Sequence, residues 1–281
     1  MMTDVQLQAL LRSRARDLLE SGAVQCVIGW ENTRARGKTR ILFARTAADA
    51  QRLVWGADCA ASTAKHLLHE RAPGGRTALC ARGCDARAVN RMISDGQLRR
   101  GEVYILGLPC TRRDTPACER CRHRNPVVYD ELIGDAVPEN GAADRFSRIA
   151  EMERLPAAER REFWRRQFQK CIRCYACRNV CPCCTCLECY LDQHRTGWQG
   201  KQLCESESRI YGLTRAYHVG DRCIECGECE RVCPVGIPIM LQTGKMLRDI
   251  NSLYGECECG LSPDETPALG KYELGDADDF A

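Results

Sequence analysis

The sequence predicts two folded parts, an α/β domain followed by a helical domain in which cysteines gather. Two observations lead to this prediction. In residues 1–135, short apolar runs alternate with segments of helical pattern, which is typical of a sheet with crossover helices. In residues 156–250, cysteines recur in two runs of the same spacing, the first directly after a charged helical segment. A length of 281 residues suits one large domain or two ordinary ones.

The elements of the first part follow from apolar periodicity and helix-start signals. Apolar residues partly on one face predict a helix over residues 4–21. The following elements are expected to be strands at 24–30 and 40–44, helices at 46–55 and 61–70, a strand at 76–81, a helix to about residue 94, and a strand at 102–108. Because these strands alternate with helices, we expect a parallel sheet.

The remaining segments are a linker, a charged helix and a tail. Residues 136–155 contain Pro138, Asn140 and Gly141, and they are expected to form a linker. Pro156 suits the first position of a helix over residues 156–170, which leads into the first cysteine run. Residues 251–281 are acidic and contain Gly and Pro, so we expect a tail that packs poorly.

The cysteine content is the unusual feature of the composition. The chain has 22 cysteines, but its N-terminus is a charged helical segment without the apolar core of a signal peptide. No stretch approaches the roughly 18 apolar residues of a membrane span. The expected location is therefore the cytoplasm, where disulfides do not persist and many thiols indicate metal binding. A net charge of +3, with cations spread along the chain, gives no indication of nucleic-acid binding.

Eight cysteines form a duplicated motif. Both copies have the spacing C-x2-C-x2-C-x3-C-P, which is the run that binds [4Fe–4S] clusters in bacterial ferredoxins. The first copy consists of Cys171, Cys174, Cys177 and Cys181, followed by Pro182, and the second consists of Cys223, Cys226, Cys229 and Cys233, followed by Pro234. Structural zinc is the alternative, but zinc knuckles are paired C-x2-C units without a fourth Cys-Pro.

The spacing predicts that the two copies exchange their fourth cysteines. Three thiolates at two-residue intervals face one cluster, whereas the fourth lies a helical turn later and points away. One cluster is thus expected on Cys171, Cys174, Cys177 and Cys233, and the other on Cys223, Cys226, Cys229 and Cys181. The proline after each run ends the helical turn.

The charges near the two runs suggest different reduction potentials. The first run carries cations and the second carries three glutamates, partly offset by arginines. The residues are Lys170, Arg173 and Arg178 in the first, and Glu225, Glu228, Glu230, Arg222 and Arg231 in the second. Our hypothesis is that the first cluster has the higher potential. The alternative is that these charges are solvated and screened.

The motifs carry a family resemblance. With 41 residues between Cys181 and Cys223, the pair resembles the α-helical ferredoxin domains of the heterodisulfide reductase and succinate dehydrogenase iron–sulfur subunits. FWRRQFQKCIRCYACRNVCP and AYHVGDRCIECGECERVCPVGIP, together with RGCDAR, GLPC and CRHRNPVVYDELIG, resemble 4Fe-4S dicluster proteins related to coenzyme F420 hydrogenase and formate dehydrogenase beta subunits. This resemblance covers about residues 20–245.

The resemblance implies a subunit that relays electrons between a hydrogenase, a formate dehydrogenase or a heterodisulfide-reductase-like module and another acceptor. A flavoprotein is the further partner that it implies. Beta subunits of the F420 type carry a flavin and an N-terminal C-x2-C-x2-C run, which this sequence lacks. A flavin- or F420-dependent oxidoreductase acting through the first domain is therefore the alternative function, and a non-redox zinc scaffold is a second one.

Two further groups of cysteines are candidate cluster sites. Cys184, Cys186 and Cys189 follow the first run closely, with Cys204 as a candidate fourth ligand. Packed thiols are the alternative interpretation of this group.

The other group belongs to the first domain. Cys110, Cys118 and Cys121 are three candidate ligands, with Cys59 or Cys84 as the fourth, and a redox thiol or a flavin pocket is the alternative. Cys84 follows Gly83 at a strand-to-helix junction, where the helix N-terminus is expected to lower its pKa. Cys110 lies just beyond a strand end, where α/β sheets bind ligands.

Overall fold

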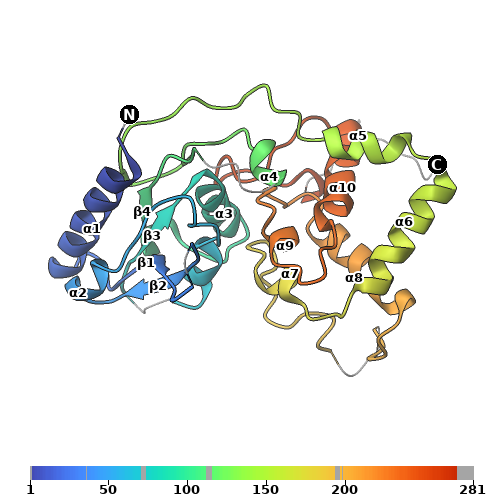
Figure 1. Cartoon of the computed structure of the whole chain (residues 1–281), viewed down its shortest axis with the longest axis horizontal. Coiled ribbons are helices and arrows are strands. Elements are labelled where there is room, and N and C mark those ends of the chain that lie inside the picture. The colour runs from blue at the N-terminus through green and yellow to red at the C-terminus, as the bar shows by residue number, and fades with distance from the viewer. Residues whose placement is uncertain are drawn as a thin grey trace. The chain divides into compact units, whose positions relative to one another are not determined.

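The computed structural model describes residues 2–35, 37–70, 74–111, 116–193, 197 and 199–270. These residues form two compact units (Figure 1). Unit 1 comprises residues 1–143 together with 260–265, and unit 2 comprises residues 144–259 together with 266–281.

The sheet of unit 1 has five strands in the order β2-β1-β3-β4-β5. They are β1 (Cys26–Asn32), β2 (Thr39–Ala44), β3 (Thr77–Ala81), β4 (Val103–Gly107) and β5 (Glu131–Leu132). β1, β3, β4 and β5 pair in parallel, but β2 pairs antiparallel with β1. The prediction of a parallel sheet was thus wrong at its edge, because the short polar loop between β1 and β2 allows a hairpin but no crossover.

Helices cover both faces of this sheet (Figure 1). The long helices are α1 (Asp4–Glu20), which starts at the capping box of Thr3 and Gln6, and α3 (Gly83–Ser94). The short ones are α2 (Ala47–Ala50), α4 (Pro116–Glu119) and the 3₁₀ helices η1 (Ala64–Leu68) and η2 (Arg100–Glu102). Leu11 of α1 packs with Trp30, Ala78 and Leu106 in one apolar core.

Two predicted helices of unit 1 are shorter than the sequence suggested. The segment 46–55 is helical only in α2, and the segment 61–70 contains only η1. After α2 the chain runs extended beside the sheet, since the Val54 backbone amide donates to the Trp30 carbonyl. Leu53 is completely buried there. Tertiary packing therefore overrides the local helical pattern.

Unit 2 is built from helices, and its described residues include no strand. The helices are α5 (Ser147–Arg154), α6 (Ala157–Lys170), α7 (Ala176–Asn179), α8 (Glu205–His218), α9 (Glu228–Arg231) and α10 (Ile239–Tyr254), followed by the 3₁₀ helix η3 (Ala268–Gly270). α8 packs against both α6 and α10.

Two glycines inside helices permit this close packing. A Cβ at Gly212 of α8 would lie 2.9 Å from the Phe168 ring of α6, and one at Gly244 of α10 would lie 2.9 Å from Ile149 of α5. Glycine in a helix interior is about 1 kcal/mol less stable than alanine. Here this cost is offset because the missing side chain lets neighbouring helices pack closely.

The expected linker and tail are more structured than the sequence suggested. The segment 136–155 contains α5, and residues 251–254 complete α10. Cys259 is buried, and Asn90 donates to the carbonyls of Gly260 and Leu261. Residues 271–281 of the predicted tail lie outside the described residues. Over the part of the chain that is described, we find no helix long and apolar enough to cross a membrane.

Candidate functional site

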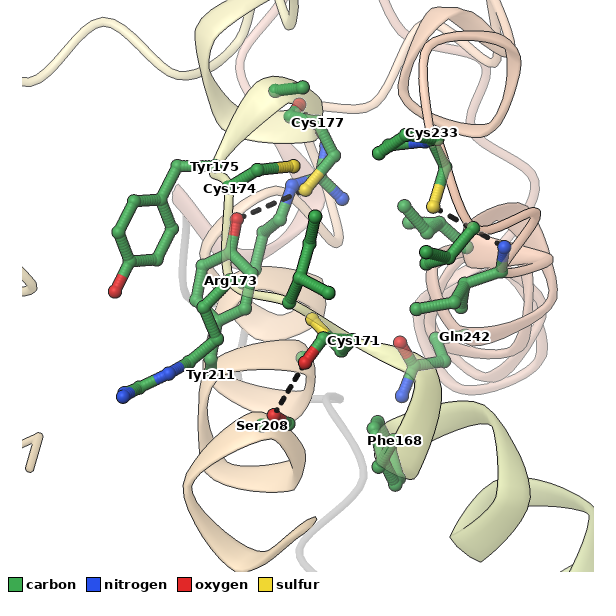
Figure 2. A pocket seen from close by; sticks show the side chains of 18 residues that line it. Phe168, Cys171, Arg173, Cys174, Tyr175, Cys177, Ser208, Tyr211, Cys233 and Gln242 are labelled. Atoms are coloured by element: carbon green, nitrogen blue, oxygen red, sulfur yellow. Dashed lines mark hydrogen bonds between the residues drawn. The ribbon is translucent and has the colours of Figure 1, made fainter. Parts of the chain in front are cut away.

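Unit 2 contains a cavity lined by Cys171, Cys174, Cys177 and Cys233. Figure 2 shows Cys233 across this cavity from the three cysteines of the first motif. The other residues around it come from the loops of the two motifs and from α6, α8 and the start of α10, including Phe168, Tyr211 and Arg215. We call it cavity 1, and its four thiols are the set that the sequence predicts for one cluster.

A second cavity is lined by Cys181, Cys223, Cys226 and Cys229. We call it cavity 2. Its wall also includes Met240 and Thr243 of α10, and Arg215 of α8 lines it as well as cavity 1. Each cavity therefore combines three cysteines of one motif with the fourth cysteine of the other.

The two motifs fold into the same loop. In the first motif Arg173 and Tyr175 have positive φ angles of 48° and 59°, and in the second Glu225 and Gly227 have 60° and 73° at the matching positions. A single helical turn follows each loop, α7 in the first and α9 in the second. This turn carries Cys181 and Cys233 away from the preceding three cysteines of their own motifs, as the spacing predicts.

Hydrogen bonds from the surrounding chain reach the thiols of both motifs. The backbone amide of Glu225 donates to Cys223 Sγ over 3.4 Å, and the amide of Ile237 donates to Cys233 Sγ over 3.3 Å. Tyr211 Oη lies 3.1 Å from Cys177 Sγ (Figure 2). Burial raises the pKa of Tyr211, so its hydroxyl keeps the proton and would donate it to Cys177 when that cysteine is a metal ligand.

Replacing Tyr211 by phenylalanine is expected to lower the reduction potential at cavity 1 only. A hydrogen bond to a ligand sulfur stabilises the added negative charge, so its loss makes reduction harder. We expect a shift of up to about 59 mV, which equals a tenfold change in a one-electron equilibrium. EPR-monitored redox titration measures it, with Tyr217→Phe as the control because Tyr217 lies on the same helix and is 63% exposed. Equal shifts in both variants would contradict the assignment.

The glutamates of the second motif are all paired with arginines. Glu225 binds Arg145 over 2.6 Å, Glu228 binds Arg231 over 2.7 Å, and Glu230 binds Arg148 over 2.9 Å. Arg145 and Arg148 come from the segment around α5, far away in the sequence. Because these pairs neutralise the negative charge, the difference in charge between the motifs is smaller than the sequence suggests, and the hypothesis of a higher first potential loses much of its basis.

Burial acts on four of the eight predicted ligand thiols. It raises the pKa of Cys171, Cys223 and Cys226, and it raises the pKa of Cys229 to about 12. Cys181 differs, because hydrogen bonds from Cys183 and Cys184 hold its pKa well below the usual range. Buried thiols of this kind ionise when a metal centre supplies compensating positive charge.

Two buried hydrogen-bond donors at the cavities indicate whether the surrounding residues could accommodate a cluster. Within the described residues, Arg215 Nε and Thr243 Oγ1 have no hydrogen-bond partner, and both side chains line cavity 2. An unsatisfied buried donor costs about 1–3 kcal/mol. Inorganic sulfides and cysteine thiolates are acceptors that satisfy such donors, so the residues fit an iron–sulfur cluster. No sequence signal distinguished Tyr211, Arg215 or Thr243 beforehand.

In unit 1, four cysteines gather at the carboxyl ends of β3 and β4. Cys84 lies in the first turn of α3, Cys110 follows β4, Cys118 lies on α4, and Cys121 comes shortly after it. Cys84 interacts electrostatically with both Cys110 and Cys121, and Cys121 also interacts with Cys118. The four thiols predicted from the sequence with Cys84 as the fourth member are thus near enough to influence one another electrostatically.

Backbone contacts hold these cysteine segments together. The Cys110 amide donates to the Arg124 carbonyl over 2.8 Å, and Cys121 Sγ donates to the His123 carbonyl over 3.3 Å. A Cβ at Gly83 would lie 2.2 Å from the His123 carbonyl, so glycine beside Cys84 is what allows the loop to approach.

One expectation for unit 1 was wrong, and Cys59 is less suited to be the fourth ligand than Cys84. The Cys59 thiol is buried in the apolar core with Cys80 and donates to the Val54 carbonyl. The pKa of Cys84 is raised rather than lowered, since burial outweighs the effect of the helix N-terminus and of Arg82.

The group behind the first motif is spread over different environments. Cys186 is exposed, while Cys184 and Cys189 are half-buried. Cys204 is the N-cap of α8, and its thiol lies 3.2 Å from Ser206 Oγ. A cluster on these four cysteines stays a prediction. In the part of the chain that is described, no three His, Cys, Asp or Glu side chains converge closely enough to hold a single metal ion.

Comparison with known proteins supports the assignment of the cysteine-rich unit. Residues 167–237 match the family model of the 4Fe-4S dicluster domain. The chain is 33% identical over 113 residues to the F420-dependent formate dehydrogenase subunit beta of Methanocaldococcus jannaschii, covering 40% of this chain and 28% of that protein. It is 54% identical over 39 residues to the F420-dependent formate dehydrogenase 1 subunit beta of Methanococcus maripaludis, covering 14% and 9%.

This chain therefore spans only about a quarter of the length of the first relative. The matched range contains both cysteine motifs and α8, the helix whose Arg215 lines cavity 1 and cavity 2. Residues 167–237 form a 4Fe-4S dicluster domain, and the chain is an iron–sulfur protein similar to the beta subunits of F420-dependent formate dehydrogenases.

Proposed function

We propose that this chain is an electron-transfer subunit that holds two [4Fe–4S] clusters in unit 2. One is bound by Cys171, Cys174, Cys177 and Cys233, and the other by Cys223, Cys226, Cys229 and Cys181. The observation that supports this proposal is that two neighbouring cavities are each lined by one crossed set of four thiols. The domain is then an α-helical two-cluster ferredoxin within residues 156–250.

The clusters supply one-electron redox chemistry, and the chain provides ligands, spacing and charge. Cys181 and Cys229 are buried, so water has little access to the thiolates of cavity 2. In contrast, Cys174 at cavity 1 is exposed, and Ile172 beside it is 51% exposed. We propose that cavity 1 lies on the side where electrons enter or leave the unit.

We propose a third cluster in unit 1 on Cys84, Cys110, Cys118 and Cys121. Its support is the electrostatic proximity of the four thiols at the carboxyl edge of the sheet, where parallel α/β sheets bind ligands. Three clusters would allow this chain to connect one redox partner at unit 1 with another at unit 2.

The partners belong to the proposal as well. The first relative is a subunit of an F420-dependent formate dehydrogenase. By analogy we propose that this chain relays electrons between a formate dehydrogenase, hydrogenase or heterodisulfide-reductase-like module and another acceptor such as a flavoprotein.

Metal analysis of protein purified without oxygen tests the proposal. We expect about twelve iron and twelve acid-labile sulfide atoms per chain, and EPR signals of reduced [4Fe–4S] clusters. About eight iron and eight sulfide atoms per chain would contradict only the proposed cluster of unit 1. Zinc without iron would contradict the whole proposal, and a bound flavin that reduces F420 unaided would favour an enzyme instead.

A further inference from the structure

Arg215 lies between the two cluster cavities. It is a residue of α8, it is 6% exposed, and it lines both cavity 1 and cavity 2. Within the described residues no other charged side chain lines both of these cavities. Its position is therefore set by the helix that packs behind both motifs.

The guanidinium group is only partly satisfied by protein atoms. Its Nη2 donates to the Cys177 carbonyl over 3.2 Å, whereas Nε has no hydrogen-bond partner among the described residues. The Cys177 carbonyl belongs to the first motif, so one arm of Arg215 is fixed at cavity 1. The Nε–H group is therefore available to an acceptor inside a cavity.

Arg215 differs in its counter-charge from three other buried arginines. Arg82 is paired with Asp85, Arg91 with Asp95, and Arg145 with Glu225. In the described part of the chain Arg215 forms no ion pair with a carboxylate. The ionisable groups that act on its charge are instead the thiols of Cys229, Cys181, Cys184 and Cys177, which belong to both motifs and the segment behind the first motif.

An unpaired buried charge is unfavourable by several kcal/mol unless an opposite charge compensates it. Arginine remains protonated even when it is buried, so it cannot avoid this cost by losing its proton. The compensation must come from negative charge at the cavities. A [4Fe–4S] cluster with four thiolates is anionic and becomes more so on reduction, so it matches this requirement.

We infer that Arg215 is the shared counter-cation of the two clusters and raises the reduction potential of both. This inference rests on the proposed two-cluster function. The Coulomb energy of a buried pair falls off slowly with distance because water does not screen it, so one cation acts on both clusters. Tyr211, in contrast, forms its hydrogen bond with Cys177 and lines cavity 1 but not cavity 2. Arg215 is a positioning and tuning residue, not a ligand.

Redox titration of Arg215→Gln, followed by EPR, tests the inference. Glutamine removes the charge but keeps a polar side chain. We expect an unchanged iron content and a lower midpoint potential for both clusters of unit 2, each by about a tenfold change in the reduced-to-oxidised ratio, or about 59 mV. The matched control is Arg166→Gln, since Arg166 is on α6, its side chain is 61% exposed, and it lines neither cavity.

The outcomes separate this inference from the proposed function. Wild-type protein without two cluster signals from unit 2 would overturn both. Two signals in the wild type, with potentials that do not move in Arg215→Gln or that move equally in Arg166→Gln, would overturn only the role of Arg215. A shift of one cluster alone would likewise overturn the shared role.

Arg215→Lys covers the case in which the glutamine variant loses iron. Lysine keeps the positive charge on a shorter side chain. We therefore expect both clusters to bind and both midpoint potentials to fall by less than about 59 mV. Iron loss in this variant too would overturn the inference, because Arg215 would then be needed for assembly and not for setting potentials. Unchanged potentials in a fully loaded lysine variant would support a purely electrostatic effect.

Discussion

Replacing Cys181 by alanine is expected to remove the cluster of the second motif and to leave the cluster of its own motif in place. Cys181 lines cavity 2 together with Cys223, Cys226 and Cys229. The variant should lose about four iron atoms per chain, because a cubane without one of its four thiolates is not held firmly. Iron analysis with EPR titration measures the loss.

The Tyr211→Phe substitution identifies which cluster remains. In a Cys181→Ala background, the surviving signal should shift when Tyr211 is replaced, because that hydroxyl lies at cavity 1. In a Cys233→Ala background, the surviving signal should not respond. The reverse pattern would show that each motif binds its own four cysteines, and the crossed arrangement would be wrong.

Cys183→Ala is the matched control for Cys181→Ala. Cys183 is also buried, it also lines cavity 2, and it interacts with Cys181, but it belongs to neither crossed set of four thiols. We expect full iron content in this variant. Loss of iron from both variants would indicate that any disturbance of this segment disrupts the site, and the assignment of Cys181 would lose its support.

The sequence predicts the crossed cysteine sets from local information, and each set lines one cavity. Spacings of two and three residues determine where a loop and one helical turn aim their thiols, as the matching φ angles of Arg173 and Glu225 illustrate. The charges around the cavities depend on long-range contacts instead. Arg145 is paired with Glu225 from 80 positions away, and no spacing rule could reveal this pair.

The fold could be predicted to a similar extent. Apolar runs located β1, β3 and β4, and helical periodicity located α1, α3 and α6. The antiparallel β2, the two-residue β5 and the short α2 depend on how the chain packs after it leaves a strand. Cys59 shows the same limit, because only the packed structure of unit 1 reveals that its thiol belongs to the apolar core.

Replacing Cys84 by alanine is expected to remove about four iron atoms from unit 1 and to leave both EPR signals of unit 2 unchanged. Cys84 is the member of its group that interacts with both Cys110 and Cys121, and no other cysteine of the group belongs to the helix after β3. Cys59→Ala is the control, since this buried thiol belongs to the apolar core. It should lower the free energy of unfolding by about 1 kcal/mol and keep all the iron. Equal iron content in wild type and Cys84→Ala would mean that the four thiols of unit 1 bind no cluster, and unit 1 would then reach its redox partner by another route.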